Sequence, residues 1–194
     1  MNIAFLASHN GSAAKAIAAA CKDGTIAAHP VLLISNNPDC GALIWAKDLR
    51  LKTAVINAKN AQDTDQTIAD MIEDNAIDMV VCSGYMKLIG PKTIQAAHGC
   101  ILNTHPALLP KHGGKGMYGR HVHQAVFDAK EQETGITIHM VDDEYDRGKI
   151  LAQKKISVSC EDSVDDIESK VKMAEPDFYI ETILRILSGE ISLA

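Results

Sequence analysis

The sequence predicts an α/β fold with a doubly wound, mainly parallel sheet, and three observations lead to this prediction. Short apolar segments rich in β-branched residues recur between Asn2 and Thr104. Stretches of helix-forming residues lie between them, so that strand and helix candidates alternate. No internal repeat or low-complexity tract interrupts this order. Such alternation is typical of parallel strands joined by helical crossovers.

Each expected element has a local reason. Asn2–Ala7 is a short apolar run, as a buried strand requires. Ser12 is expected to cap the first helix, because a Ser hydroxyl accepts a hydrogen bond from an N–H of the first turn. Ala13–Ala20 then consists almost entirely of strong helix formers. Strands are expected at Asn2–Ala7, Pro30–Ser35, Thr53–Ile56, Met79–Cys82 and Cys100–Thr104, and helices at Ser12–Lys22, Gly41–Leu51, Thr67–Asn75 and Pro91–Ala97.

The pattern changes after Thr104. His105–Arg120 holds two prolines and four glycines and predicts a long loop, which in a compact domain is usually functional. Pro176 is expected to bend or restart the last helix, since it lacks a backbone N–H. No linker is evident, so we expect a single domain over residues 1–194. The remaining elements are a helix over His121–Lys130, strands over Gly135–Val141 and Ile150–Val158, and an amphipathic helix over Ser163–Leu187.

Composition and charge exclude several classes of protein. The net charge is −6 with no basic stripe, which argues against nucleic-acid and anionic-membrane partners. No apolar run approaches the roughly 20 residues that span a bilayer, and the N-terminus lacks the basic segment of a signal peptide. The five cysteines are widely spaced without a C-x-x-C pair, so neither a metal site nor a disulfide is expected. We expect a cytoplasmic protein that acts on small molecules; the sequence does not indicate its oligomeric state.

The first segment that could carry chemistry is Ser8-His9-Asn10-Gly11-Ser12, between the first strand and the first helix. Backbone N–H groups at a helix start form an anion site, helped by the helix dipole. The segment matches neither the dinucleotide-binding nor the Walker-type glycine pattern. A tight turn with a Ser cap explains the same residues, so a phosphate site and a plain turn both stay open.

The second segment is Asn103-Thr104-His105-Pro106, at the carboxyl end of the fifth expected strand. Open α/β sheets bind ligands at this edge. Strand alternation places Asn103 and His105 on one side and Thr104 on the other. An amide donor beside an imidazole suits a carbonyl whose oxygen becomes negative during attack. The alternative is a turn-forming Asn followed by a solvated His.

The third segment is Asp142-Asp143-Glu144-Tyr145-Asp146-Arg147-Gly148, after the strand that contains His139. Its carboxylates form either a solvated turn or a group that raises the basicity of His105 or of a water. The calcium-loop pattern is absent. His139 is interpreted as a buried inner-strand histidine rather than a catalyst. We expect this loop to lie beside Asn103 and His105.

Together these segments resemble the glycinamide ribonucleotide formyltransferases, the folate-dependent enzymes of purine synthesis, over nearly the whole chain. The N-x-H-P-x-L-L-P run is specific to folate-dependent formyltransferases as a group. The resemblance implies a Rossmann-type formyltransferase fold, with 10-formyltetrahydrofolate as formyl donor and no metal. The matching motifs are Asn10-Gly11-Ser12, Ser35-Asn36-Asn37, Ser83-Gly84-Tyr85-Met86-Lys87-Leu88-Ile89, Asn103-Thr104-His105-Pro106-Ala107-Leu108-Leu109-Pro110-Lys111, Gly113-Gly114-Lys115-Gly116-Met117-Tyr118-Gly119 and Tyr145-Asp146-x-Gly148.

The resemblance also implies roles for individual residues. Asn103, His105 and Asp146 match the catalytic trio of the family. The residues that match its acceptor site are Gly11, Ser12 and Ala13 in the phosphate loop, and Lys172 and Glu175 on the last helix. Those that match its folate site are Met86, Lys87, Leu88, Ile89, Asn103, Asp142, Asp143, Glu144, Tyr145 and Asp146.

Departures from the family pattern fall on the acceptor side. Ala13 stands where the family usually has Asn, Lys172 where it has Gln, and Glu175-Pro176 begins the usual E-H-x-x-Y-P segment. An Arg usual near Thr64 is missing. Glycinamide ribonucleotide is the preferred acceptor. The alternatives are a different amine such as an amino sugar nucleotide, water in a formyl-folate hydrolase, and a folate-binding module without catalysis.

Overall fold

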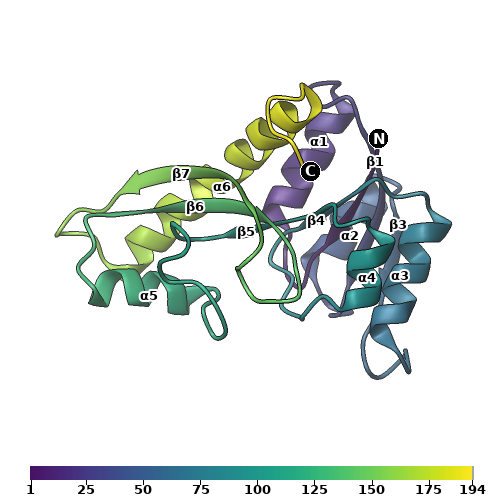
Figure 1. The fold of residues 1–194 in the computed structure, drawn as a ribbon, viewed down its shortest axis with the longest axis horizontal. Helices are drawn as coiled ribbons and strands as arrows, with labels where there is room; N and C mark the ends of the chain where they lie inside the picture. The colour runs from purple at the N-terminus through teal and green to yellow at the C-terminus, as the bar shows by residue number, and fades with distance from the viewer. Residues whose placement is uncertain (194) are drawn as a thin grey trace. The chain divides into compact units, whose positions relative to one another are not determined.

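The computed structural model of the protein describes residues 1–193. Contacts within the chain divide it into two compact units, an N-terminal unit of Met1–Asn103 and a C-terminal unit that begins at Thr104. The single domain expected from the sequence stays a prediction. The strands are β1 (Asn2–Leu6), β2 (His29–Ser35), β3 (Lys52–Val55), β4 (Met79–Cys82), β5 (Ile101–His105), β6 (Glu133–Met140) and β7 (Ile150–Ser157); the helices are α1 (Ser12–Lys22), α2 (Gly41–Asp48), α3 (Thr64–Asp74), α4 (Pro91–Ala96), α5 (Arg120–Asp128) and α6 (Val164–Leu187) (Figure 1).

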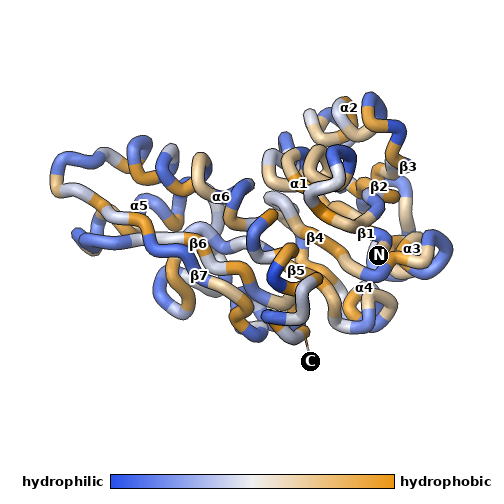
Figure 2. The backbone as a smooth tube through the Cα atoms, turned by 90° about the horizontal axis from the view of Figure 1, so that it is seen from above, coloured by the Kyte–Doolittle hydropathy of each residue, from blue (hydrophilic) through white to orange (hydrophobic). Residues whose placement is uncertain are grey.

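A parallel sheet forms the centre of the N-terminal unit, with its strands in the order β3-β2-β1-β4-β5. Phe5 of β1 pairs with Leu33 of β2 on one side and with Val81 of β4 on the other. Helices α1 and α2 cover one face of these strands, and α3 and α4 cover the other (Figure 2). Crossovers on both faces define a doubly wound sheet, so the predicted fold class is confirmed.

The core of this unit lies along its central strands. Every residue of β4 is buried, and β1 is buried from Ile3 onward. Figure 2 shows the same strands in the hydrophobic colour. Strands of a parallel sheet that is covered on both faces are expected to be continuously apolar, because neither face meets water.

The C-terminal unit contains a β-hairpin and two helices. Strands β6 and β7 are antiparallel, with Thr137 opposite Gln153. Helix α6 packs against both strands and against α5. The full strand order is β3-β2-β1-β4-β5-β6-β7, which is mainly parallel with an antiparallel edge.

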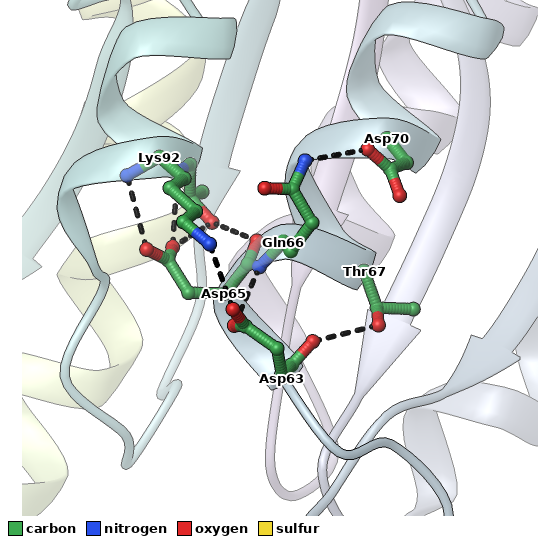
Figure 3. Close-up of polar contacts among 7 residues, drawn as sticks. Asp63, Asp65, Gln66, Thr67, Asp70 and Lys92 are labelled. Atoms are coloured by element: carbon green, nitrogen blue, oxygen red, sulfur yellow. Dashed lines mark hydrogen bonds and ion pairs between the residues drawn. The ribbon is translucent and has the colours of Figure 1, made fainter.

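The start of α4 is fixed by a carboxylate of α3 (Figure 3). Asp65 accepts hydrogen bonds from the backbone N–H groups of Lys92 and Thr93 and from the Thr93 hydroxyl, at 2.6 to 3.0 Å. Lys92 Nζ also pairs with Asp63 at 2.7 Å. A Cβ on Gly90 would overlap the Asp65 carboxylate, so this position needs glycine for space. The network joins α3 to α4 on one face of the sheet.

Each expected element is present, with bounds that differ by a few residues. Helix α3 begins at Thr64 instead of Thr67, because the Asp63 side chain accepts a hydrogen bond from the N–H of Gln66 and acts as the N-cap. The long loop lies between His105, which ends β5, and Arg120, which begins α5. No helix within residues 1–193 is both long and apolar enough to cross a membrane.

The expected cap of α1 was wrong. Gly11 is the N-cap, and Ser12 is the first helical residue, with no hydrogen bond from a side chain at the cap. Gly11 has a φ of 58°, in the left-handed region that glycine adopts at little cost. A Cβ there would also lie only 3.2 Å from the Cβ of Ala7. Glycine therefore occupies the N-cap position because the turn is tight and has a left-handed backbone.

The expected restart of the last helix at Pro176 was also wrong, whereas the expected bend stays a prediction. Helix α6 continues through it from Val164 to Leu187. Val171 and Phe178 are buried on the two sides of the proline, so tertiary packing holds both halves of the helix. The packing outweighs the missing N–H, whose loss would end an isolated helix.

Candidate active site

A side chain of α2 anchors the turn between β1 and α1. The Trp45 Nε1–H donates to the carbonyl of Asn10 at 2.9 Å. Gly11 and Ala13 are buried, whereas Ser12 is exposed. Of the three residues predicted to hold a phosphate, Ser12 is therefore the one that a ligand reaches directly, at the positive end of the α1 dipole.

Ser8 ties this turn to two other loops at the carboxyl ends of the strands. Its hydroxyl donates to Asn36 Oδ1 at 2.5 Å and accepts from the N–H of Met86 at 2.8 Å. Its own N–H donates to the carbonyl of Gly84 at 3.2 Å. The loops after β1, β2 and β4 thus share one buried hydroxyl. Sequence reasoning missed this role of Ser8.

The loop after β4 presents apolar side chains to solvent. Met86 is 42% exposed and Leu88 57% exposed, with Lys87 exposed between them. Ile89 is half-buried. Exposed apolar side chains at the ligand-binding edge of a sheet are suited to cover a flat heterocycle. The folate role of Met86–Ile89 stays a prediction.

Strand β5 carries two of the predicted catalytic residues. Asn103 is half-buried and lies opposite Cys82 of β4 in the parallel ladder. His105, the last residue of the strand, is 3% exposed. Alternation along the strand places these side chains on one face and Thr104 on the other.

Asp146 lies between two buried imidazoles. Its Oδ2 is 3.4 Å from Nδ1 of His105, which confirms the predicted proximity of these residues; the same proximity for Asn103 stays a prediction. Its Oδ1 is 3.6 Å from Nε2 of His139, which is 3% exposed. The Nδ1–H of His139 is positioned to donate to the carbonyl of Met140 at 2.8 Å. His139 is buried as predicted, but it also faces the Asp146 carboxylate, which sequence reasoning did not foresee.

The backbone around Asp146 is constrained on both sides. The N–H of Gly114 donates to its Oδ2 at 2.9 Å. Asp146 itself has a φ of 57°, an unusual value for a non-glycine residue. A Cβ on Gly148 would overlap the backbone of Met140 at the end of β6, so glycine allows the loop to pass close to the strand. This explains the spacing of the Tyr145-Asp146-x-Gly148 motif.

The base of the long loop is fastened to the β6–β7 hairpin. The Thr137 hydroxyl donates to the carbonyl of Ala107 at 2.7 Å and accepts from the N–H of Leu109 at 3.0 Å. Gln153 Nε2 donates to the carbonyl of Leu109 and to the Thr137 hydroxyl, both at 2.9 Å. This network, centred on the buried Thr137 hydroxyl, holds the segment after His105 in place. Sequence reasoning missed both Thr137 and Gln153.

His105 has an acceptor beside each ring nitrogen. Nδ1 faces the Asp146 carboxylate, and Nε2 lies 2.8 Å from the carbonyl oxygen of His112. Burial lowers the pKa of His105 below its ordinary value, while the Asp146 charge and the His112 carbonyl act in the opposite direction. Asp146 thus supports the protonated imidazole, as expected, but burial has the larger effect on the pKa.

The predicted acceptor residues of the C-terminal unit lie on α6. Lys172 is exposed and pairs with Glu168, one turn earlier, at 2.5 Å. Glu175 is half-buried, and its Oε1 accepts a hydrogen bond from the Thr104 hydroxyl at 2.6 Å. Burial raises the pKa of the Glu175 carboxyl, although the Thr104 hydrogen bond and the Lys172 charge partly oppose this. The two residues therefore differ, because the Lys172 side chain lies in solvent whereas the Thr104 hydrogen bond fixes the Glu175 carboxylate.

The Asp142–Asp146 loop presents an apolar ring beside its carboxylates. Tyr145 is 47% exposed, and Asp143 and Glu144 are exposed. Asp142 is half-buried and its Oδ1 accepts a hydrogen bond from the N–H of Glu144. Among residues 1–193, no group of three or more His, Cys, Asp or Glu side chains is placed to hold a metal ion.

Comparison with known proteins gives consistent matches. Residues 1–183 match the family described as formyl transferase. The chain is 36% identical to a phosphoribosylglycinamide formyltransferase of Haemophilus influenzae, over 98% of this chain and 89% of that protein. It is also 36% identical to a chloroplastic phosphoribosylglycinamide formyltransferase of Arabidopsis thaliana over 93% of this chain, and spans 63% of that relative's length. A crystal structure of phosphoribosylglycinamide formyltransferase from Bacillus halodurans aligns with a TM-score of 0.89 at 30% identity, covering 97% of this chain and 96% of that one.

Proposed function

The chain belongs to the formyl transferase family, and we propose that it transfers the formyl group of 10-formyltetrahydrofolate to the amine of glycinamide ribonucleotide, a step of purine synthesis. One observation carries the proposal: the Asp146 carboxylate lies 3.4 Å from the buried imidazole of His105, at the carboxyl end of a parallel strand. Relatives named phosphoribosylglycinamide formyltransferase, at 30% to 36% identity over nearly the whole chain, support this acceptor.

His105 and Asn103 would stabilise the oxygen that becomes negative when the amine attacks the formyl carbon. A protonated His105 supplies an N–H donor and a positive charge, and Asn103 supplies an amide N–H. Asp146 keeps the imidazole oriented and favours its protonated form by its charge. As the new N–C bond forms, the amine proton passes to Asp146 through a water. The bond to N10 of the folate then breaks, and N10 takes the proton that Asp146 received, returned through the same water.

Each unit by itself presents side chains that are suited to the folate. Met86 and Leu88 in the N-terminal unit provide exposed apolar side chains, as a pterin ring needs. The Asp142–Asp146 loop in the C-terminal unit provides the exposed ring of Tyr145 and backbone polar groups. Lys87, Ile89, Asp143 and Glu144 complete the proposed folate residues.

Residues proposed for the acceptor are found within each unit by itself. The phosphate would sit at the turn of Gly11, Ser12 and Ala13, where Ser12 is exposed at the start of α1. Glu175 would accept hydrogen bonds from sugar hydroxyls through its unshared carboxylate oxygen. Lys172 would add a positive charge near the acceptor after leaving its pair with Glu168, which is exposed and therefore weak.

A turnover assay tests the proposal. The purified protein is mixed with 10-formyltetrahydrofolate and glycinamide ribonucleotide, and formylated product and tetrahydrofolate are both quantified. Equal amounts of the two products support the proposal. Folate release without formylated product indicates hydrolysis, and formylation of another amine from a panel, such as an amino sugar nucleotide, indicates a different acceptor. Folate binding without release indicates a binding module.

A matched pair of variants assigns the activity to the site. His105→Ala should reduce kcat by about 10²–10⁴-fold or more, because it removes a donor and a charge at the reacting centre. His121→Ala is the control, since His121 is exposed on α5 and lies outside the proposed site. Full activity in a folded His105→Ala variant would contradict the proposed centre.

A further inference from the structure

Side chains on the two faces of β5 contact different carboxylates at the end of the strand. His105 points toward Asp146, while the preceding residue, Thr104, hydrogen-bonds to Glu175 of α6. The distance from Thr104 Oγ1 to Glu175 Oε1 is 2.6 Å, across 71 residues of sequence. A hydroxyl that donates to a carboxylate forms a charge-assisted hydrogen bond, which is shorter and stronger than a neutral one. The contact therefore restricts where the Glu175 carboxylate can lie.

Only one of the two oxygens of the Glu175 carboxylate has a hydrogen-bond partner among residues 1–193. It is half-buried, yet within the described residues its second oxygen, Oε2, accepts no hydrogen bond. Lys172, the charged group that acts on it, pairs with Glu168 instead. Oε2 is not among the buried unpaired polar atoms of residues 1–193, so it stays accessible and can accept a hydrogen bond from a ligand in place of water.

We propose that Thr104 is a positioning residue for acceptor binding: its hydroxyl holds Oε1 of Glu175, so that Oε2 is presented to the sugar hydroxyls of the acceptor. This inference rests on the proposed function, because it takes a ribose-bearing acceptor as the ligand. It adds a role for Thr104 that neither strand alternation nor the family motifs assign. The same strand end then serves both substrate positioning and chemistry.

Kinetics of three variants test the proposal. Thr104→Val keeps the shape of the side chain and removes the hydroxyl, so it should raise the KM for glycinamide ribonucleotide about fivefold, the factor for the loss of one ordinary hydrogen bond. The kcat and the KM for the folate should stay unchanged, and Thr104→Ser should restore the acceptor KM. Thr134→Val is the matched control, since the Thr134 hydroxyl is buried without a partner among residues 1–193.

The pH dependence separates positioning from a purely structural tether. Without the Thr104 hydrogen bond, which lowers the pKa of Glu175, that pKa should rise further. Glu175 then becomes protonated at a higher pH as the solution is acidified, so acceptor affinity should begin to fall at a higher pH in Thr104→Val than in the wild type. A ¹³C NMR titration of the Glu175 carboxyl in the free protein measures the same shift without any substrate.

A double-mutant cycle completes the test. In a Glu175→Ala background, Thr104→Val should cause no further change in acceptor KM, because the partner of the hydroxyl is gone. If Thr104→Val fails to fold, Thr104→Ala gives the same comparison. An unchanged acceptor KM, or an equal loss in kcat and in both KM values, overturns the inference while wild-type turnover still supports the proposed function. A wild type that does not formylate glycinamide ribonucleotide overturns the proposed function and this inference together.

Discussion

The carbonyl oxygen of His112 lies 2.8 Å from Nε2 of His105. This contact occupies the ring N–H that the proposed mechanism needs for the formyl oxygen, because the other nitrogen faces Asp146. The His112 segment must therefore move away from His105 before the donor binds productively. The side chain of His112 is 3.3 Å from Glu131, and Lys111 Nζ pairs with the same carboxylate at 3.1 Å.

Weakening this anchor should help the segment to move. Glu131→Gln removes the charge that holds Lys111 and His112, so we expect kcat/KM for the folate to rise by no more than about fivefold, since exposed ion pairs contribute up to ~1 kcal/mol. Steady-state kinetics measure the change, with Glu133→Gln as control because Glu133 pairs with Lys155 on the hairpin instead. A fall in kcat/KM would mean that the observed loop position is the productive one.

Asp146→Asn should reduce kcat by about 10²–10⁴-fold, because the proposed mechanism gives Asp146 a part in proton transfer. It should leave the fold intact, because Asp146 lies in a loop. The Asp146 charge raises the pKa of His105, so its removal should lower that pKa further. If protonated His105 is the active form, the alkaline decline of kcat should then begin at a lower pH. Asp128→Asn, the same change at an exposed residue at the end of α5 and outside the proposed site, is the control. Near-normal kcat in folded Asp146→Asn would remove Asp146 from the mechanism.

His139→Leu should lower kcat by less than Asp146→Asn does. The change removes the second imidazole beside Asp146 but leaves the carboxylate and its contact with His105. We expect the effect in kcat rather than in either KM, because His139 is buried and acts through Asp146. A pH profile of kcat for both variants makes the comparison. A larger loss for His139→Leu than for Asp146→Asn would contradict this order.

Gly148→Ala should reduce activity without unfolding the protein. An added Cβ would overlap the backbone of Met140, so the loop must shift and carry Asp146 away from His105. We expect kcat to fall toward the level of Asp146→Asn. Arg147→Ala is the control, because its side chain is 74% exposed in the same loop. Kinetics and circular dichroism together distinguish a displaced loop from an unfolded chain.

Pro176→Ala should stabilise the protein. Pro176 lies inside α6, where proline costs about 3 kcal/mol relative to alanine in a regular helix, and part of that cost should be recovered. The free energy of unfolding in urea measures the gain, and Asp177→Ala is the control at the exposed next position. A decrease in stability would show that the helix is built around the proline.

The sequence by itself determined the elements and their class. Apolar runs separated by helix formers predicted the strands and helices to within a few residues, since these signals are local. The motif around His105 and the one around Asp146 identified two sides of the candidate site. Burial of the first strand also followed from its composition, because only a doubly covered sheet hides such a continuous apolar run.

Only the tertiary structure decided the pairings. The sequence predicted that the Asp146 loop lies beside His105, but the contact of His139 with Asp146 and that of Thr104 with Glu175 join long stretches of chain that no local pattern encodes. The two wrong expectations have the same origin. The cap at Gly11 depends on how closely α1 approaches neighbouring side chains, and the unbroken α6 depends on buried residues on both sides of its proline. Local propensities are worth about a kilocalorie per residue, so packing energies of several kilocalories override them wherever the two disagree.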